Sequence, residues 1–595
     1  METRRNGSAS SKRIKKSVLF MENKHGAYHK YYLWAMAVLT CCFSIFLTAR
    51  TYFINYWPTD SENPYLPAAA NLFQLRFLSE MHNVLYQGII KVVMHGKEAL
   101  ILGIAIMQRI LNDYQTTFPN VFLLIIAIAV SGILLYLIMR HIFSEHIGII
   151  AFILFFACFW PYLYMLQGAH PPFALMNFLL AIFFLQRAQS RKEFYFLSGI
   201  FLGLLPFSSP AAVMYAPYYL AFFLYQESKL HPGQKDIKQV WFCIRFIFFG
   251  FLAVFLLFTI PHPIHNTLEY LRFVNISRHS NNFAIYHNYL SQFFPVAPHL
   301  RGGGIVWIIK YFFLIMPVMF PAYLLSAAYL FFRSFKKPLI ALILLVCFST
   351  PILVEISGVV QFGRNYFSWL PGIIFLICFA IDDIFKKITD ASSAPHRKIL
   401  IGLIAALLLG HIISNFKAFF FEVLPSRMVT TDIYNWLIHE KNTNELFVYR
   451  RHPRYINMIL FFNNPKYENK VYQWPINSIA EVKKGYILIP TVTGKTIWCE
   501  CRERDFNDDP ALNELLESGE FNRYVVASFP SLSSSRLWTQ EEEICTYRDL
   551  IVGDITDKDR QKGFAWILDA EKLQSEWFAK KFNQNIEQTR PNRLK

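Results

Sequence analysis

The chain has 595 residues, of which 54% are hydrophobic and only 17% are charged, whereas soluble proteins carry about 25% charged residues. This composition excludes an ordinary soluble protein and predicts a polytopic α-helical membrane protein. The formal net charge of +17 comes from Lys and Arg residues clustered between apolar runs. That arrangement is typical of topology signals and lipid contacts, so we expect no nucleic-acid partner.

Residues 1–30 are basic and polar, and the first apolar run follows at 31–49. A cleaved signal peptide would place its apolar core nearer the start of the chain, so we expect an uncleaved signal anchor. The positive-inside rule then places residues 1–30 in the cytoplasm and the loop at 54–119 outside. Short amphipathic stretches in this loop, such as 99–111, are suited to lie in the membrane interface.

Residues 31–414 are predicted to form a transmembrane domain of about eleven helices, because apolar runs long enough to cross a bilayer recur throughout it. The run at 194–224 counts as two spans with an outside turn, since Pro206-Phe-Ser-Ser-Pro210 interrupts it. A second large outside loop is expected at 261–304. The predicted spans are 31–49, 121–139, 147–166, 173–185, 194–224, 241–260, 305–332, 338–356, 367–385 and 399–413.

The polar tail, residues 415–595, is predicted to be a small soluble α/β domain. An odd number of spans places it outside, on the same side as the loop at 54–119. Runs with strand-like composition lie at 446–449, 486–490 and 524–527. Residues 430–441 and 509–517 have helical patterns.

Three motifs carry a family resemblance. The sequence Asp60-Ser-Glu62-Asn-Pro-Tyr65-Leu-Pro-Ala-Ala follows the first span, Ser198-Gly-Ile-Phe-Leu-Gly precedes the predicted outside turn, and Gly363-Arg364-Asn-Tyr366-Phe-Ser-Trp-Leu-Pro371 enters a late span. With these motifs in this order, residues 31–420 resemble the GT-C superfamily of membrane glycosyltransferases. The branch that it resembles includes the dolichyl-phosphate-mannose protein mannosyltransferases and the bacterial aminoarabinose transferase.

The chain also departs from the pattern of that family. The spacing from the acid to Tyr65 is one residue longer, which leaves open whether Asp60 or Glu62 occupies the catalytic position. The outside turn lacks the usual Lys, and the loop Gly168-Ala-His170-Pro-Pro has no second acid. His82-Asn-Val-Leu stands where the family has Pro-Pro-Leu. These differences leave the class of acceptor open.

The resemblance implies a sugar donor linked to a polyprenyl phosphate and a glycan, lipid or protein acceptor. A carboxylate base would activate the acceptor hydroxyl, and cations would hold the departing phosphate. No cofactor or metal site is predicted, and a divalent cation would be held only weakly by carboxylates and phosphate. The expected site residues are the catalytic carboxylates Asp60 and Glu62, the phosphate contacts Arg364 and Lys310, and the substrate-site residues Tyr65, His170 and Tyr366.

Two other functions remain open at this point. A lipid-linked glycan transporter or flippase would also be polytopic, but it is expected to show internal repeats or charges near the middle of the membrane, and neither is clear in this sequence. A non-catalytic GT-C-like scaffold would not need the acids. For location we expect a bacterial inner membrane, with the amino terminus in the cytoplasm and residues 415–595 extracytoplasmic.

Overall fold

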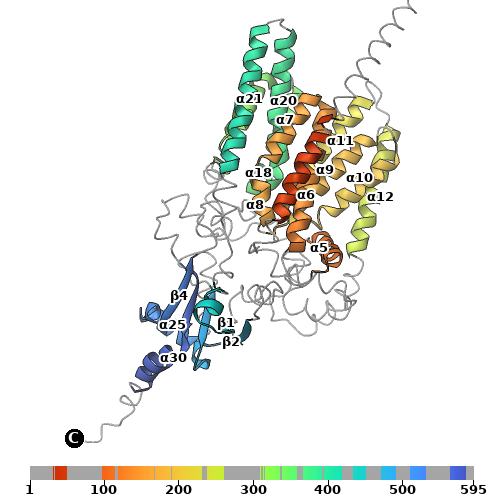
Figure 1. Cartoon of the computed structure of the whole chain (residues 1–595). Coiled ribbons are helices and arrows are strands. Elements are labelled where there is room, and N and C mark those ends of the chain that lie inside the picture. The colour runs from red at the N-terminus through yellow and green to blue at the C-terminus, as the bar shows by residue number, and fades with distance from the viewer. Residues whose placement is uncertain are drawn as a thin grey trace, which may run out of the picture.

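The computed structural model describes residues 31–49, 97–113, 118–259, 309–357, 366–417, 433–449, 471–490, 509–530 and 563–583. Within these ranges it leaves out 33, 167, 189–190, 231–236, 310–311, 314, 336–337, 391–393 and 434. The described residues form a bundle of helices and, beyond one end of that bundle, a mixed β-sheet with helices (Figure 1). We call the end of the bundle that lies toward the sheet the sheet-proximal end, and the other the sheet-distal end.

The bundle is built from helices of unequal length. Among the described residues, four stretches are long and apolar enough to cross a membrane, namely Phe118–Ile142, Val240–Leu257, Phe367–Ile388 and Lys398–Lys417. The α-helices of the bundle are α5 (Glu98–Leu111), α6 (Phe118–Ile142), α7 (Glu145–Phe156), α8 (Trp160–Leu166), α9 (Pro171–Arg187), α10 (Glu193–Leu204), α11 (Ala216–Leu230), α12 (Ile237–Thr259), α16 (Met319–Ser334), α17 (Pro338–Cys347), α18 (Ser349–Ser357), α20 (Leu370–Asp390) and α21 (Ala394–Lys417). A further apolar helix covers Trp34–Ala49.

Several predicted spans are interrupted in the structure. The span at 147–166 divides into α7 and α8, and the span at 338–356 divides into α17 and α18. The predicted turn at 206–210 lies between α10 and the 3-10 helix η3 (Pro210–Tyr215). Hydropathy alone cannot reveal the breaks inside 147–166 and 338–356, because Ala157, Cys158 and Phe348 are as apolar as the helices around them. The expectation of about eleven spans stays a prediction.

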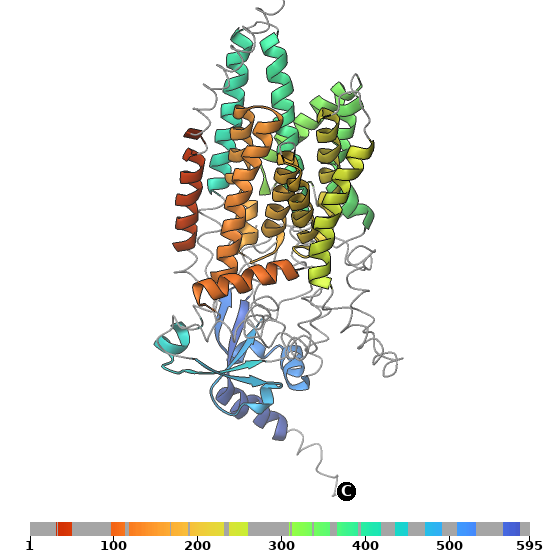
Figure 2. The same ribbon diagram turned by 90° about the vertical axis from the view of Figure 1, so that its right-hand side faces the viewer.

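Helix α5 lies across the sheet-proximal end of the bundle (Figure 2), and its position in the membrane interface stays a prediction. Its inner face contains Leu100 and Ile104, which are fully buried, and a Cβ placed on Gly103 would lie 2.9 Å from a Leu123 methyl group on α6. The outer face exposes Ile106 and Ile110. The helix is therefore packed on one side and free to meet lipid headgroups on the other.

Helices α10 and α12 cross at unusually close range. A Cβ placed on Gly199 would overlap the backbone carbonyl of Ile247, and one placed on Gly250 would overlap the carbonyl of Phe196. At Gly203 the added atom would lie 2.9 Å from the carbonyl oxygen of Phe251. Small residues four apart let the backbones of two membrane helices touch. The motif Ser198-Gly-Ile-Phe-Leu-Gly therefore has a packing role in this chain.

The last helix of the bundle, α21, is held by two buried polar side chains. His411 and Asn415 are 0% and 1% exposed, and both reach the break between α7 and α8. The Nε2 atom of His411 lies 2.9 Å from the carbonyl oxygen of Leu154, and Asn415 Oδ1 accepts a 3.0 Å hydrogen bond from the Phe159 amide. The break leaves these two backbone groups outside the regular helical pattern, and α21 satisfies them.

Residues 433–583, where described, form a five-stranded sheet in the order β2-β1-β3-β5-β4. The strands are β1 (Glu445–Tyr449), β2 (Tyr472–Ile476), β3 (Tyr486–Pro490), β4 (Val525–Pro530) and β5 (Gly563–Asp569). β1 is parallel to β2 and β3, whereas β5 is antiparallel to β3 and β4. The predicted strands at 446–449, 486–490 and 524–527 correspond to β1, β3 and β4.

Alternate residues of the sheet enter two apolar cores, as expected for strands covered on both faces. Ile487 and Leu568 pack with residues of α25 (Pro510–Glu517) and of the π-helix η9 (Leu573–Phe578). Their neighbours Leu488 and Ile567 belong to the same apolar cluster as the helical bundle. The predicted helix at 509–517 is α25, and the described residues of the helix predicted at 430–441 include the π-helix η7 (Trp436–Glu440).

The glycine crossing yields a test with a matched control. We expect Gly199→Ala to lower the thermal unfolding midpoint of the purified protein, because its methyl group must push the backbones of α10 and α12 apart. Gly402→Ala is the control, since a Cβ at Gly402 has no atom within 4 Å, and helix propensity favours Ala over Gly by about 1 kcal/mol. Equal midpoints for the two variants would contradict the proposed crossing.

The polar contacts of α21 yield a second test. Replacing Asn415 with Leu leaves the Phe159 amide buried without a partner, at a cost of about 1–3 kcal/mol. We therefore expect Asn415→Leu to lower the unfolding midpoint and to increase protease cleavage after α21. Ile413→Ala, at a position that is 59% exposed, should change neither, and a neutral Asn415→Leu would show that these contacts do not hold the helix.

Candidate functional site

Five of the seven predicted site residues lie outside the described residues. These are Asp60, Glu62, Tyr65, Lys310 and Arg364. The structure places His170 and Tyr366, the other two, and both occur where the chain turns at the sheet-proximal end. The site is therefore built here from these two residues and the elements around them.

His170 caps the start of α9. It is 4% exposed, and two prolines follow it in the first turn of the helix. The chain arrives at this point through Gly168, which has a φ of 65° that favours glycine. The buried Asn120 of α6 donates a 3.0 Å hydrogen bond to the Gly168 carbonyl oxygen, so the loop before His170 is fixed from α6.

Tyr366 immediately precedes η5 (Phe367–Trp369), the 3-10 turn that leads into α20. Its side chain is fully buried, and its ring lies 6.1 Å from that of Phe312. Edge-on ring contacts continue from Phe312 to Trp160 at 5.3 Å and from Trp160 to Phe367 at 5.1 Å. Aromatic rings therefore join α8 to the entry of the late span.

In the predicted outside turn before η3, the hydroxyl group of Ser208 forms hydrogen bonds within the protein. Ser208 donates to the Leu204 carbonyl oxygen at 2.7 Å and accepts from the Asn177 amide of α9 at 2.9 Å. The Phe207 carbonyl oxygen accepts a 2.8 Å bond from the Ala99 amide at the start of α5. These bonds tie the turn to α9 and α5 and account for Ser208 without assigning it chemistry.

The segment that follows the second motif meets the third motif in space. Element η3, which follows the turn, contacts both η5 and α18, and η5 also contacts α9. Behind η3, the Tyr218 hydroxyl lies 3.3 Å from Thr350, and Ser368 lies 3.5 Å from the same Thr350 hydroxyl. A Cβ at Gly372 would lie 2.5 Å from the Tyr218 hydroxyl, so a larger residue at this position would require the Tyr218 side chain to move.

The structure adds residues that the sequence did not single out. Asn120, Asn177 and Thr350 are buried and hold the backbone or side chains near the sheet-proximal end. A signal for them exists, because polar side chains inside apolar runs are uncommon in membrane helices. Among the residues that the structure describes, no group of three or more His, Cys, Asp or Glu could hold a metal ion.

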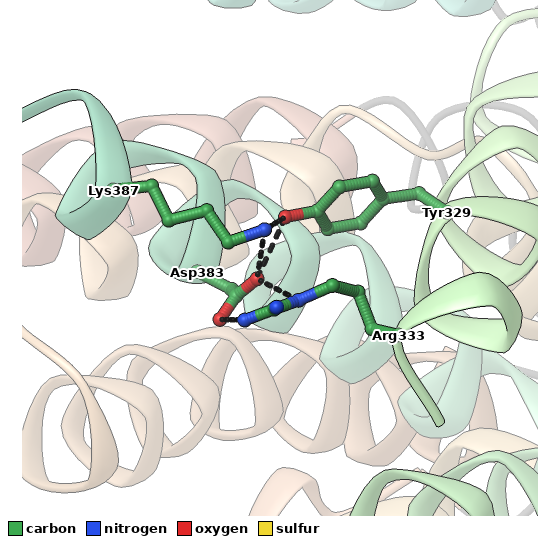
Figure 3. Close-up of polar contacts among 4 residues, drawn as sticks. All are labelled: Tyr329, Arg333, Asp383 and Lys387. Atoms are coloured by element: carbon green, nitrogen blue, oxygen red, sulfur yellow. Dashed lines mark hydrogen bonds and ion pairs between the residues drawn. The ribbon is translucent and has the colours of Figure 1, made fainter. Parts of the chain in front are cut away.

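Charged side chains gather instead at the sheet-distal end. On α16 and α20, Asp383 accepts two 3.3 Å hydrogen bonds from Arg333 and one of 2.7 Å from the Tyr329 hydroxyl, and Lys387 lies 3.4 Å from the same carboxylate (Figure 3). Arg140 pairs with Glu145 at 2.6 Å at the junction of α6 and α7. The contacts described above are thus aromatic and neutral polar at the sheet-proximal end and ion pairs at the sheet-distal end.

Comparison with known proteins gives one family match. Residues 101–265 match the family model for dolichyl-phosphate-mannose-protein mannosyltransferase. This segment runs from α5 to just beyond α12 and includes His170, the glycine crossing and the turn before η3. No curated protein sequence matches the chain.

Solved structures similar to the chain are distant in sequence. ArnT from Cupriavidus metallidurans in the apo state is 11% identical with a TM-score of 0.45, over 76% of this chain and 92% of that one. The oligosaccharyltransferase of Archaeoglobus fulgidus in the apo form is 12% identical with a TM-score of 0.42, over 78% and 70%. AglB from the same organism, in complex with an inhibitory peptide and a dolichol-phosphate, is 12% identical with a TM-score of 0.42, over 76% and 62%.

The family match lies within residues 31–420, the segment on which the sequence resemblance was based. It covers the second motif and the loop of His170, whereas the first and third motifs lie outside it. The chain resembles the GT-C superfamily of membrane glycosyltransferases.

Proposed function

We propose that this protein is an integral membrane glycosyltransferase that moves a sugar from a polyprenyl-phosphate donor to an acceptor hydroxyl. The observation that carries the proposal is the match of residues 101–265 to the mannosyltransferase family. The reaction is proposed to occur at the sheet-proximal end of the bundle, where His170 and Tyr366 lie.

The arrangement of the motifs supports that location. Tyr366 is buried at the sheet-proximal end, and Arg364 precedes it by only two residues in the sequence. η3, which follows the second motif, contacts η5, the turn of the third. A transferase site needs residues from several separate segments at one place, and this end of the bundle is where such segments meet.

The distribution of charge supports an extracytoplasmic orientation for the site. Arg140, Arg333 and Lys387 lie in the last turns of α6, α16 and α20 or just before them, at the sheet-distal end. Basic residues favour the cytoplasmic side of a membrane. The sheet-proximal end and residues 415–595 would then face the extracytoplasmic side, in keeping with a bacterial inner membrane protein.

The proposed chemistry requires one base and one or two cations. The polyprenyl phosphate leaves as a stable anion, so the leaving group needs no protonation, and a carboxylate that orients and deprotonates the acceptor hydroxyl suffices. We assign this task to Asp60, with Glu62 as the alternative. Arg364, whose planar fork matches phosphate oxygens, and Lys310 would hold the departing charge.

His170 and Tyr366 have supporting roles in this proposal. Both are almost completely buried, so they fit residues that shape one wall of the substrate site better than residues that meet bulk solvent. Tyr65 is proposed as a further contact to the substrate. A divalent cation is not required by this scheme, since the Arg364 and Lys310 side chains supply positive charge at the phosphate.

The test is transfer of radiolabelled sugar in membranes supplied with a panel of polyprenyl-phosphate sugars. We expect Asp60→Asn to reduce transfer by at least about 100-fold, the scale of a lost general base. We expect Arg364→Ala to raise the donor concentration needed for half-maximal transfer and to reduce the rate. Glu62→Gln distinguishes the two acids, and Glu571→Gln, at an exposed position of the helix α30 (Ala570–Lys572), is the matched control.

Expression level and elution profile of each variant must equal those of the unmodified protein. If every donor remains unused, or if both acid variants transfer as well as the control, the transferase proposal fails. A flippase would then be recognised by movement of intact lipid-linked sugar across the membrane. A scaffold would show neither transfer nor movement.

A further inference from the structure

An exposed arginine lies within one of the membrane-spanning helices. Arg245 belongs to the span Val240–Leu257 of α12, five residues inside its first position, which is about 8 Å at the helical rise. It is exposed, as are the neighbouring Phe248 and Phe249, at 55% and 58%. This face of α12 therefore meets lipid, where an unpaired guanidinium is costly.

The side chain of Arg245 turns back toward the sheet-distal end of the bundle. Its guanidinium carbon lies 5.3 Å from the ring centroid of Trp241, one turn earlier on α12. Helical side chains point toward the amino terminus of their helix, and α12 begins at the sheet-distal end, so this direction carries the charge out of the apolar layer. The charge thus reaches the level of the headgroups.

A second cation meets it there from α10. Lys192 precedes α10, and its ammonium group lies 5.0 Å from the ring centroid of Phe242. Phe242 follows Trp241 directly, so the two cations flank one pair of aromatic rings. Trp241 is 53% exposed and Phe242 is 37% exposed. We call these four residues, Lys192, Trp241, Phe242 and Arg245, the basic aromatic patch.

Neither cation forms an ion pair with a carboxylate in the part of the chain that the structure describes. Among the described acids, Glu193 directly follows Lys192 and is exposed in the first turn of α10, and Glu227 belongs to α11. Glu227 is 7% exposed and accepts a 3.0 Å hydrogen bond from the Tyr195 hydroxyl. Glu227 therefore lies beneath the patch rather than on it.

We propose that the basic aromatic patch binds the headgroup of an anionic phospholipid. The occupant follows from charge: two cations at the membrane surface attract a phosphate, and the ammonium group of a zwitterionic headgroup would be repelled by them. Arg245 offers a planar fork to phosphate oxygens and Lys192 a point charge. Phe248 and Phe249, on the exposed surface of the same helix, would contact the acyl chains.

The patch also lies beside the crossing that α10 and α12 form through Gly199 and Gly250. A lipid held by Lys192 on one helix and Arg245 on the other would bridge both and reinforce that crossing. The proposal is independent of the transferase chemistry, because none of its residues belongs to the proposed catalytic site. An experiment can therefore disprove this proposal without affecting the proposed function.

The test uses the purified full-length protein in neutral detergent with added phosphatidylglycerol or phosphatidylcholine. Bound lipid is counted by native mass spectrometry, and the thermal unfolding midpoint is recorded in parallel. We expect the unmodified protein to prefer phosphatidylglycerol, and this preference to fall about fivefold for each cation removed by Lys192→Gln and Arg245→Gln. For Arg245→Lys, which keeps the charge but loses the planar fork, we expect a preference for phosphatidylglycerol between those of the unmodified protein and of Arg245→Gln.

The matched control removes two exposed cations from another membrane helix, Lys398→Gln and Lys417→Gln on α21. It changes the net charge equally and should keep the preference for phosphatidylglycerol. The proposal is overturned if the unmodified protein binds both lipids equally, or if the control loses the preference as completely as the patch variant. Unchanged unfolding midpoints without lipid would show that the substitutions act on binding and not on folding.

Discussion

The structure depends on satisfying backbone hydrogen-bonding groups where membrane helices break. Inside a bilayer no water is available to pair with a free amide or carbonyl, and each unsatisfied group costs several kcal/mol. Between α7 and α8 the Cys158 amide donates to the Phe155 carbonyl oxygen, one residue short of the regular pattern. His411 and Asn415 then pair with the two backbone groups that remain, the Leu154 carbonyl oxygen and the Phe159 amide. Since a carbonyl only accepts, His411 must carry its proton on Nε2, and its Nδ1 accepts from Asn415.

That constraint explains why interrupted spans and buried polar residues occur together. Each break lets an apolar segment change direction near the sheet-proximal end, and a polar residue from a distant segment pairs with it. Asn120 fixes the loop before His170 in this way, and Asn177 fixes the turn before η3. The same end therefore contains short helices such as η3 and η5, which bring separate motifs together. A continuous helix has no such turns, so it could not bring these residues together at this end of the bundle.

Much of this architecture is predictable from the sequence, and the reasons for the misses are physical. Strands β1 and β3 follow from their β-branched and aromatic content, and α5 follows from its amphipathic pattern. The breaks within 147–166 and 338–356 were missed because hydropathy averages over them. The glycines at 199 and 203 were identified as part of a family motif, yet their role in a helix crossing needed the position of Ile247 on α12. His411 and Asn415 were missed although polar residues in the run at 399–413 and just after it were a visible signal. Asp60, Glu62, Tyr65, Lys310 and Arg364 stay predictions, since they lie outside the described residues.

The two ends of the bundle hold its helices by different kinds of contact. At the sheet-proximal end, α9 and α20 begin in tight turns where glycine, proline and buried hydroxyls set the geometry. At the sheet-distal end, α16 and α20 are joined by the side chains around Asp383, and α10 and α12 carry the basic aromatic patch. At the distal end the ion pairs of Asp383 hold α20 against α16, and α10 and α12 touch through their backbones near Gly199. Because Tyr366 leads directly into the turn that begins α20, the helix that starts beside Tyr366 is also held at its other end.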